Sequence, residues 1–364
     1  MLCSILLPAL LLLAPALPQD TSPEALKEVD ALFQTWNEYD TPGMAVGIIH
    51  EGELVYEKGF GMANLETGMA NGPEVPYRIG STSKQFTAMS VTLLELDGKI
   101  DLDAPLTKYF PEFTANEPPV LVRQLIHHTS GIPDYIGIQF RAGGGWKAWF
   151  TPEQSLQVIA KAELEFTPGS KFSYSNSNYL LMGMLVERTS GKTLRDFARE
   201  RIFDPLGMDE TRYQDRHDEV IVGRSHGYSR QQEENRGDWK VDITHLDHVG
   251  DGGVFTTIQD LAKWDANFYE NKLGHGQELL DAMHAPGILN GGEVLPYARG
   301  LGHKLHRKLP TVSHGGAWVG YLAEMVRFPE QRLTVIVLAN QTECSPTQLA
   351  LKAADICLAD VYGK

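Results

Sequence analysis

Short apolar segments separated by turn-forming residues occur near both ends of the chain and predict β-strands there. Residues 44–50 and 53–60 are two such segments, and Glu51-Gly52 between them favours a tight turn, so together they predict a β-hairpin. Segments of the same character return in the second half of the chain. The strands expected outside the hairpin cover residues 222–228, 309–313, 321–328 and 333–339.

Apolar residues at every third or fourth position, the spacing of helices, dominate the chain from residue 81 to about 212. The segment from Ser22 to Tyr39 is also amphipathic, and Ser22-Pro23 supplies a suitable N-cap and first helical residue. A last helix is expected over 350–361. Strands at both ends and helices between them predict an α+β fold, in which an antiparallel sheet is flanked by the terminal helices and a mainly helical region is inserted.

This order of elements predicts two lobes. Residues 17–80 and 222–364 are assigned to a sheet lobe and residues 81–221 to a helical lobe, and together they form one catalytic unit. Ser81 lies at the boundary, and the junction between two lobes is a common place for a pocket.

The segment Ser81-Thr-Ser-Lys84 is the first candidate for chemistry. At the start of a helix, a Ser-x-x-Lys step puts the hydroxyl and the amine on one face, one turn apart. The amine can then take or hold the proton of the serine and make it a nucleophile. Gly80 would allow a sharp turn into the helix. One such motif is about what chance supplies, so the alternative is a surface lysine on an amphipathic helix.

A second candidate is Tyr174-Ser-Asn176, in a turn-rich loop that is expected to run from residue 167 to 179 and lead into a helix over 180–188. A tyrosine beside a lysine ammonium can act as a general base, and an asparagine can bind a substrate amide. The same Tyr-x-Asn pattern recurs at Tyr269, where it reads as solvated surface.

A third candidate is His314-Gly-Gly-Ala317, which follows the strand expected at 309–313. Two glycines would let a ligand lie close to the strand backbone, although a β-bulge or turn explains them equally well. The N–H groups of Ser81 and Ala317 could together form an oxyanion hole.

These three motifs, in this order and spacing, resemble those of the penicillin-recognising serine hydrolases, in the branch of the class C β-lactamases and D,D-peptidases. The resemblance runs from about Pro42 to Ala339 and implies a β-lactamase/transpeptidase-like fold. Further segments that look like signatures of this family are residues 125–135, 205–211 and 252–262.

The resemblance also implies a role for each residue. Ser81 corresponds to the acylated nucleophile, Lys84 to its activator or proton acceptor, and Tyr174 to a base for acylation or deacylation. Which of Lys84 and Tyr174 carries the proton stays open. The remaining candidates would bind substrate: Asn176, His314, Gly315 and Gly316.

Two departures from the family pattern bear on the substrate. His314 replaces a permanently charged lysine with a group that is largely neutral at pH 7. Gly315 replaces the usual threonine or serine, and so removes a hydroxyl that could bind a substrate carboxylate. Losing one such charge-assisted hydrogen bond costs about 1.5–3 kcal/mol. Penicillins and D-Ala-D-Ala peptides both carry that carboxylate, so the sequence favours an esterase, amidase or D-aminopeptidase-type hydrolase.

Two other functions stay open at this stage. One is a class C-type β-lactamase or D,D-carboxypeptidase, and the other is a non-catalytic protein that senses penicillins or muropeptides. The presence of Ser81, Lys84 and Tyr174 together favours an enzyme over a sensor. The expected partner is a small-molecule or peptide substrate, and no cofactor or metal is expected.

The first sixteen residues are apolar and end in Ala14-Pro-Ala16, a suitable cleavage site, so they predict a signal peptide although they lack a basic residue. An exported protein, periplasmic or secreted, is therefore expected. The formal net charge of −15 argues against binding to nucleic acids or anionic membranes. No other segment is long and apolar enough to span a membrane.

Cys344 and Cys357 are expected to be free thiols, because a helix that begins at Pro346 would hold them about 16 Å apart. The paired histidines at 127–128, 245/248 and 303/306 lack a second cluster of metal ligands and are expected to be structural or surface residues. Trp146 and Trp149 are expected to pack rather than line a pocket.

Overall fold

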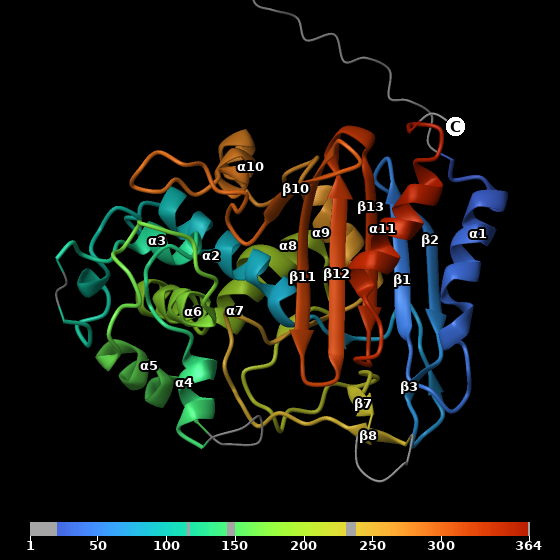
Figure 1. The fold of residues 1–364 in the computed structure, drawn as a ribbon, viewed down its shortest axis with the longest axis horizontal. Coiled ribbons are helices and arrows are strands. Elements are labelled where there is room, and N and C mark those ends of the chain that lie inside the picture. The colour runs from blue at the N-terminus through green and yellow to red at the C-terminus, as the bar shows by residue number, and fades with distance from the viewer. Residues whose placement is uncertain (1–19, 115–116, 144–149, 231–237, 363–364) are drawn as a thin grey trace, which may run out of the picture.

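The computed structural model describes residues 20–114, 117–143, 150–230 and 238–362. The expected signal peptide, Trp146 and Trp149 therefore lie outside the described residues. A six-stranded antiparallel sheet occupies one side of the molecule and most of the helices the other (Figure 1). The order of the strands in this sheet is β10-β11-β12-β13-β1-β2. Its members are β10 (Gly302–His306), β11 (Leu309–Trp318), β12 (Tyr321–Phe328), β13 (Leu333–Ala339), β1 (Met44–His50) and β2 (Glu53–Phe60).

The sheet is buried on both faces near its centre. Alternate residues of β1 point to opposite sides: Val46 packs in an apolar cluster with the terminal helices α1 (Pro23–Phe33) and α11 (Pro346–Cys357), and Ala45 packs in the main core. On the main-core face, helix α9 (Ile258–Asn267) comes so close that a Cβ at Gly47 would lie 2.4 Å from the Ile258 side chain.

The helical region is built around α2 (Lys84–Leu96), which is buried along nearly its whole length. The ring of Phe86 lies 4.6 Å from that of Trp264 and 5.3 Å from that of Phe203, so α2 is fixed by aromatic contacts from two sides. The other helices here are α3 (Val122–Ile126), α4 (Tyr135–Arg141), α5 (Pro152–Lys161), α6 (Asn176–Ser190), α7 (Leu194–Ala198), α8 (Asp204–Leu206) and α10 (Gly276–His284).

Short elements connect the two regions. Strands β5, β9 and β6 form a three-stranded sheet in the order β5-β9-β6, and β3 pairs with β4 and β7 with β8. The 3₁₀ turn η2 (Gly80–Ser83) joins β5 to α2 and packs against β11. The bounds are β3 (Met62–Asn64), β4 (Met69–Ala70), β5 (Tyr77–Arg78), β6 (Arg212–Tyr213), β7 (Tyr228–Arg230), β8 (Trp239–Val241), β9 (Val254–Thr256), η1 (Gln34–Trp36), η3 (Leu106–Lys108), the π-turn η4 (Arg199–Phe203) and η5 (Pro329–Gln331).

The predicted α+β fold is confirmed, and so are the hairpin and the strands at 321–328 and 333–339. The strand expected at 222–228 is wrong, because the chain turns there with Gly223 in the left-handed region (φ 70°) and β7 begins only at Tyr228. The division of the chain into two lobes stays a prediction.

Several boundaries also differ from the prediction. The helix expected over 22–39 ends at Phe33 and continues only as η1 to Trp36, and the last helix runs from Pro346 to Cys357. Strand β11 continues through the two glycines to Trp318, so these do not end the strand.

Cys344 and Cys357 are free thiols. Among the helices of the described ranges, none combines the length and apolar character needed to cross a membrane.

Candidate active site

The turn that carries Ser81 is fixed by its neighbours on both sides. Gly80 has a φ of 50°, and a Cβ there would lie 2.6 Å from the backbone nitrogen of Ala317. Only glycine combines this conformation with so close an approach. On the other side of Ser81, the Thr82 hydroxyl donates to the carbonyl of His314 at 3.1 Å. The turn and strand β11 are therefore held together next to Ser81, which is partly exposed.

Lys84 is completely buried, and its amine has three polar contacts. Nζ donates to Ser81 Oγ at 3.0 Å, to Asn176 Oδ1 at 2.9 Å and to the backbone carbonyl of Asp251 at 2.6 Å. An ammonium would use all three N–H groups in these contacts. A neutral amine would keep the two donors to Asn176 and Asp251 and present its lone pair to the Ser81 hydroxyl. The same geometry thus serves an amine that holds a proton and one that takes it.

Tyr174 lies beside this amine at the N-terminal end of α6. Lys84 Nζ is 5.0 Å from the centre of the Tyr174 ring, and the ring is 4.3 Å from that of the buried His128. Tyr174 itself is 40% exposed, so its phenol is open to substrate and solvent. The structure therefore brings together the alcohol and amine of the first motif and the phenol of the second.

Asn176 is the first residue of α6. The loop before it ends at Ser175, whereas it was expected to run to residue 179. Its side-chain oxygen accepts from Lys84, and both its backbone N–H and its Nδ2 donate to Asp134 Oδ2 at 2.8 Å. In this arrangement Asn176 holds Lys84 in place. Its predicted contact with a substrate amide stays a prediction.

His314 lies on the opposite wall of the cleft, on β11, and is 9% exposed. Its Nδ1 lies 2.6 Å from the carbonyl of Gly315, which can only accept, so Nδ1 carries a proton and Nε2, 3.1 Å from the Tyr297 hydroxyl, is the acceptor. Burial, with the nearby Lys84, lowers the pKa of His314 to about 4. His314 is accordingly a neutral hydrogen-bonding group at pH 7.

The two glycines of the third motif lie against parts of the chain itself. A Cβ at Gly316 would lie 1.9 Å from the carbonyl oxygen of Ile79, so this glycine permits β11 to approach the Ser81 turn. A Cβ at Gly315 would lie 3.0 Å from Glu324 Oε2. Packing against the backbone thus explains the absence of a side chain at Gly316, whereas Gly315 lies close to the end of the Glu324 side chain.

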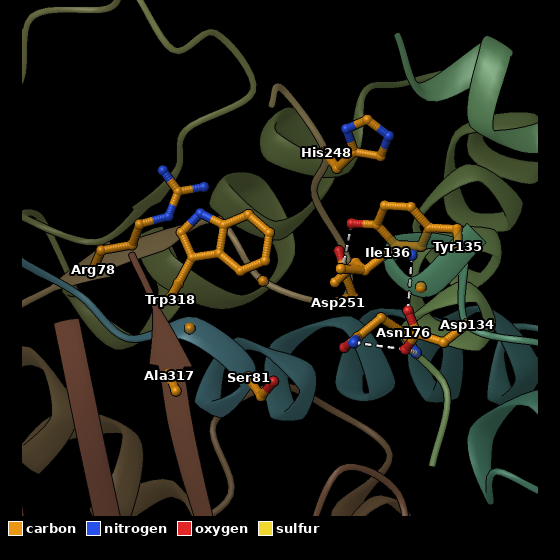
Figure 2. Close-up of a pocket in the computed structure, with 14 residues that line it drawn as sticks. Arg78, Ser81, Asp134, Tyr135, Ile136, Asn176, His248, Asp251, Ala317 and Trp318 are labelled. Carbon is orange, nitrogen blue, oxygen red and sulfur yellow. Dashed lines mark hydrogen bonds between the residues drawn. The ribbon is translucent and has the colours of Figure 1, made fainter. Parts of the chain in front are cut away.

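Ser81 borders two cavities, and a third begins at residues that line the second. One of about 410 Å³ is lined by Ser81 and Ala317 together with Asp134, Asp251 and Arg78 (Figure 2). A second, of about 530 Å³, is also lined by Ser81 and Ala317 and continues past His314 and Gly315. A third, of about 720 Å³, begins at Tyr174 and His314 and is lined by both apolar and polar side chains. The expected oxyanion hole of Ser81 and Ala317 stays a prediction, but both residues border the same space.

The 410 Å³ cavity contains two carboxyl groups. Asp134 Oδ1 accepts from the backbone N–H of Ile136 at 2.8 Å, and Asp251 Oδ2 accepts from the Tyr135 hydroxyl at 2.9 Å (Figure 2). Burial raises the pKa of Asp251, although Lys84 opposes this effect. Arg78 is the positively charged residue among those that line this cavity.

Four residues of the site were not identified as candidates from the sequence: His128, Asp134, Asp251 and Tyr297. His128 and Asp134 lie inside the signature segment 125–135, and Asp251 directly precedes the segment 252–262, so proximity to these segments was the available signal. Tyr297 had no local signal at all, because only the fold brings it to His314.

Two other groups of residues lie away from this site. Tyr269 follows α9 and packs under Arg332, 4.5 Å from its ring centre, so the second Tyr-x-Asn pattern is separate from Ser81. In the part of the chain that the structure describes, no three His, Cys, Asp or Glu residues are grouped so as to hold a metal ion.

Comparison with known proteins shows the family to which the chain is related. The profile of the Beta-lactamase family matches residues 29–357. The chain is 30% identical over 350 residues to Penicillin-binding protein 4* of Bacillus subtilis, covering 90% of this chain and 75% of that protein. It is 29% identical to the D-aminopeptidase of Brucella canis over 88% of this chain, but it spans only 60% of the length of that enzyme.

Solved structures agree on the fold. An octameric penicillin-binding protein homologue from Pyrococcus abyssi matches with a TM-score of 0.79 and 28% identity, over 92% of this chain and 77% of that one. A D-amino acid amidase from Ochrobactrum anthropi matches with a TM-score of 0.75 over 93% of this chain and 98% of that one, and at 21% identity this likeness concerns the fold alone.

Proposed function

The chain belongs to the Beta-lactamase family of serine hydrolases, and on this premise we propose that it cleaves an ester or amide through an acyl-enzyme on Ser81. The observation that carries this proposal is the 3.0 Å contact between Lys84 Nζ and Ser81 Oγ, made by an amine that is buried and held by two further acceptors. A buried, fixed amine next to a hydroxyl that borders a cavity is what activation of a serine requires.

The reaction follows from this arrangement. Ser81 Oγ attacks the substrate carbonyl as its proton passes to Lys84 or Tyr174, and the N–H groups of Ser81 and Ala317 stabilise the oxyanion. The leaving group takes up the proton as the tetrahedral intermediate collapses and the acyl-enzyme forms. Water, activated by the same amine or phenol, then releases the acid and frees Ser81.

The acyl part of the substrate would enter the 410 Å³ cavity beside Asp134 and Asp251. Two carboxyl groups in so small a space favour an acyl group that carries an ammonium, as in a D-amino-acid amide or a peptide with a free D-amino terminus. The 29% identity to D-aminopeptidases supports this substrate class. The neutral His314 argues against β-lactamase or D,D-carboxypeptidase activity as the main function, because both substrates present a carboxylate.

The apolar residues 1–16 support export of the protein to the periplasm or the medium. Expression of the full chain with a C-terminal tag, followed by fractionation and N-terminal sequencing, tests this part. Export predicts a mature chain that begins near residue 17, whereas an intact Met1 in the cytosol would contradict it.

The activity is tested with nitrophenyl esters, D-amino-acid nitroanilides and nitrocefin, each assayed with the wild type and with Ser81→Ala. We expect ester hydrolysis that Ser81→Ala abolishes while its circular dichroism is unchanged, and faster cleavage of D-alanine nitroanilide than of its N-acetyl derivative. Equal ester turnover by Ser81→Ala would contradict the proposal. Stable labelling by a fluorescent penicillin without any turnover would instead indicate a sensor.

A further inference from the structure

Glu324 occupies the space beside Gly315. The two residues are directly paired between strands β11 and β12, and a Cβ at Gly315 would lie 3.0 Å from Glu324 Oε2. In the family pattern, the position of Gly315 carries a hydroxyl that could bind a substrate carboxylate. Here the hydroxyl is absent, and a carboxyl group of the protein lies beside that place.

This carboxyl group is built into the site. Glu324 is 3% exposed, and its Oε2 accepts a hydrogen bond from Thr347 at the start of α11. Both Glu324 and Thr347 line the 720 Å³ cavity, and Thr347 also lines the 530 Å³ cavity that Ser81 borders. A substrate group that extends from Ser81 past Gly315 would therefore meet this carboxyl group.

We propose that Glu324 is a specificity-determining residue that disfavours substrates whose leaving group carries a carboxylate. The inference rests on the proposed function, because it concerns the substrate of the same site. The leaving groups that the site would accept are then amines, ammonia (from a primary amide) or alcohols that carry no carboxylate of their own.

Repulsion of a wrong substrate is as effective a source of specificity as attraction of the right one. An anionic leaving group would meet the Glu324 carboxyl next to a neutral His314, where the family pattern has a cation. Burial raises the pKa of Glu324, and both its bond to Thr347 and the charge of Lys304 act against this rise. Lys304 is itself exposed to solvent, which screens its attraction for a substrate.

The test uses two substrates of similar shape, one with an anionic and one with a neutral leaving group: 3-acetoxy-4-nitrobenzoate and its methyl ester, assayed at pH 8. The measured quantity is the ratio of kcat/KM for the anionic ester to that for the neutral ester. We expect Glu324→Gln, which keeps an acceptor for Thr347, to raise this ratio at least tenfold while the neutral ester is hydrolysed at nearly the wild-type rate.

Glu293→Gln is the matched control, because it removes a negative charge from the exposed rim of the same 720 Å³ cavity and should change the ratio less than twofold. An unchanged ratio in Glu324→Gln, or an equal rise in both variants, would overturn the inference.

A second variant keeps the inference testable if Glu324→Gln is unstable. Glu324→Ala also removes the carboxyl group and should raise the ratio above that of the wild type. The wild-type ratio in a folded Glu324→Ala variant would overturn the inference. If the wild type does not hydrolyse the neutral ester at all, the proposed function is refuted. This result differs from an unchanged substrate ratio, which refutes only the inference about Glu324.

Discussion

The two walls of the cleft differ in how closely their polar groups match the family pattern for serine hydrolysis. On the wall formed by η2 and α2, Lys84 is buried and uses all of its polar contacts to hold Ser81, Asn176 and the carbonyl of Asp251 together. On the wall formed by β11 and β12, the neutral His314 stands where the family pattern has a cation. Glu324 lies beside Gly315, where the family pattern has a hydroxyl.

In the proposed mechanism, nucleophile activation and substrate selection are therefore separable. The proposed acyl chemistry uses a short, local step from Ser81 to Lys84, whereas the proposed preference for a leaving group depends on two neighbouring strands. A chain can therefore keep nucleophile activation and change its leaving-group preference. Variants on the wall of η2 and α2 should lower turnover of all substrates, and variants on the wall of β11 and β12 should change the ratio between substrates.

The largest effect is expected from Lys84→Met. Removing the amine takes away the activator of Ser81, so kcat/KM for a neutral nitrophenyl ester should fall by about 10³-fold. It also leaves Asn176 Oδ1 and the Asp251 carbonyl without their donor, at a cost of about 1–3 kcal/mol for each group. Steady-state kinetics with thermal unfolding measure both, and an active, folded variant would show that the two walls do not differ in the proposed way.

Tyr174→Phe should have the next largest effect. The ring would keep its contact with His128, but the hydroxyl would be lost, so kcat should fall by about 10²-fold with little change in KM. Tyr269→Phe makes the same chemical change in the second Tyr-x-Asn pattern and should leave kcat unchanged. Equal effects of the two substitutions would remove Tyr174 from the chemistry.

Gly80→Ala tests the contact between the two walls. An added Cβ would lie 2.6 Å from the Ala317 nitrogen at a residue with positive φ, so the Ser81 turn must move away from β11. We expect kcat/KM to fall about tenfold and stability to fall by about 1–2 kcal/mol. Gly98→Ala is the control, since Gly98 has a φ of 70° but open space around it, and it should cost stability without loss of activity.

The smallest effect on activity is expected from His314→Asn, whose main consequence is for the pH dependence of stability. The pKa of His314 is about 4 in the folded protein and near 6.5 in the unfolded chain, so the unfolded state binds the proton first as the pH falls. The stability associated with a neutral His314 is present above pH 6.5 and is lost between 6.5 and 4.

Between pH 8 and pH 5, His314→Asn should therefore lose up to about 2 kcal/mol less unfolding free energy than the wild type. Urea denaturation at several pH values measures this. The pH profile of kcat between 6 and 9 should keep its shape in the variant, and a new or lost ionisation there would show that His314 titrates during catalysis.

The parts of the site that could be predicted from sequence are those whose residues are close together in the chain. Ser81 and Lys84 are one helical turn apart, and the hairpin at 44–60 is defined by its own turn, so local spacing was sufficient. Tyr174 and His314 could be identified only through the family resemblance, because their approach to Ser81 depends on the whole fold.

The remaining contacts could not be predicted, because they join distant segments through atoms that leave no pattern in the sequence. Asp251 holds Lys84 with a backbone carbonyl, which any residue could supply. Gly316 was predicted to make room for a ligand, but the space beside it holds the carbonyl of Ile79. Glu324 reads as one polar residue of a strand, and only the pairing of β11 with β12 places it beside Gly315.

The acyl-enzyme on Ser81 is tested by intact-protein mass spectrometry during turnover of a slowly deacylating nitrophenyl ester. We expect the protein to gain the mass of one acyl group and peptide mapping to locate this group on Ser81, with no adduct in Ser81→Ala. Turnover without any adduct, or an adduct on another residue that persists in Ser81→Ala, would contradict it.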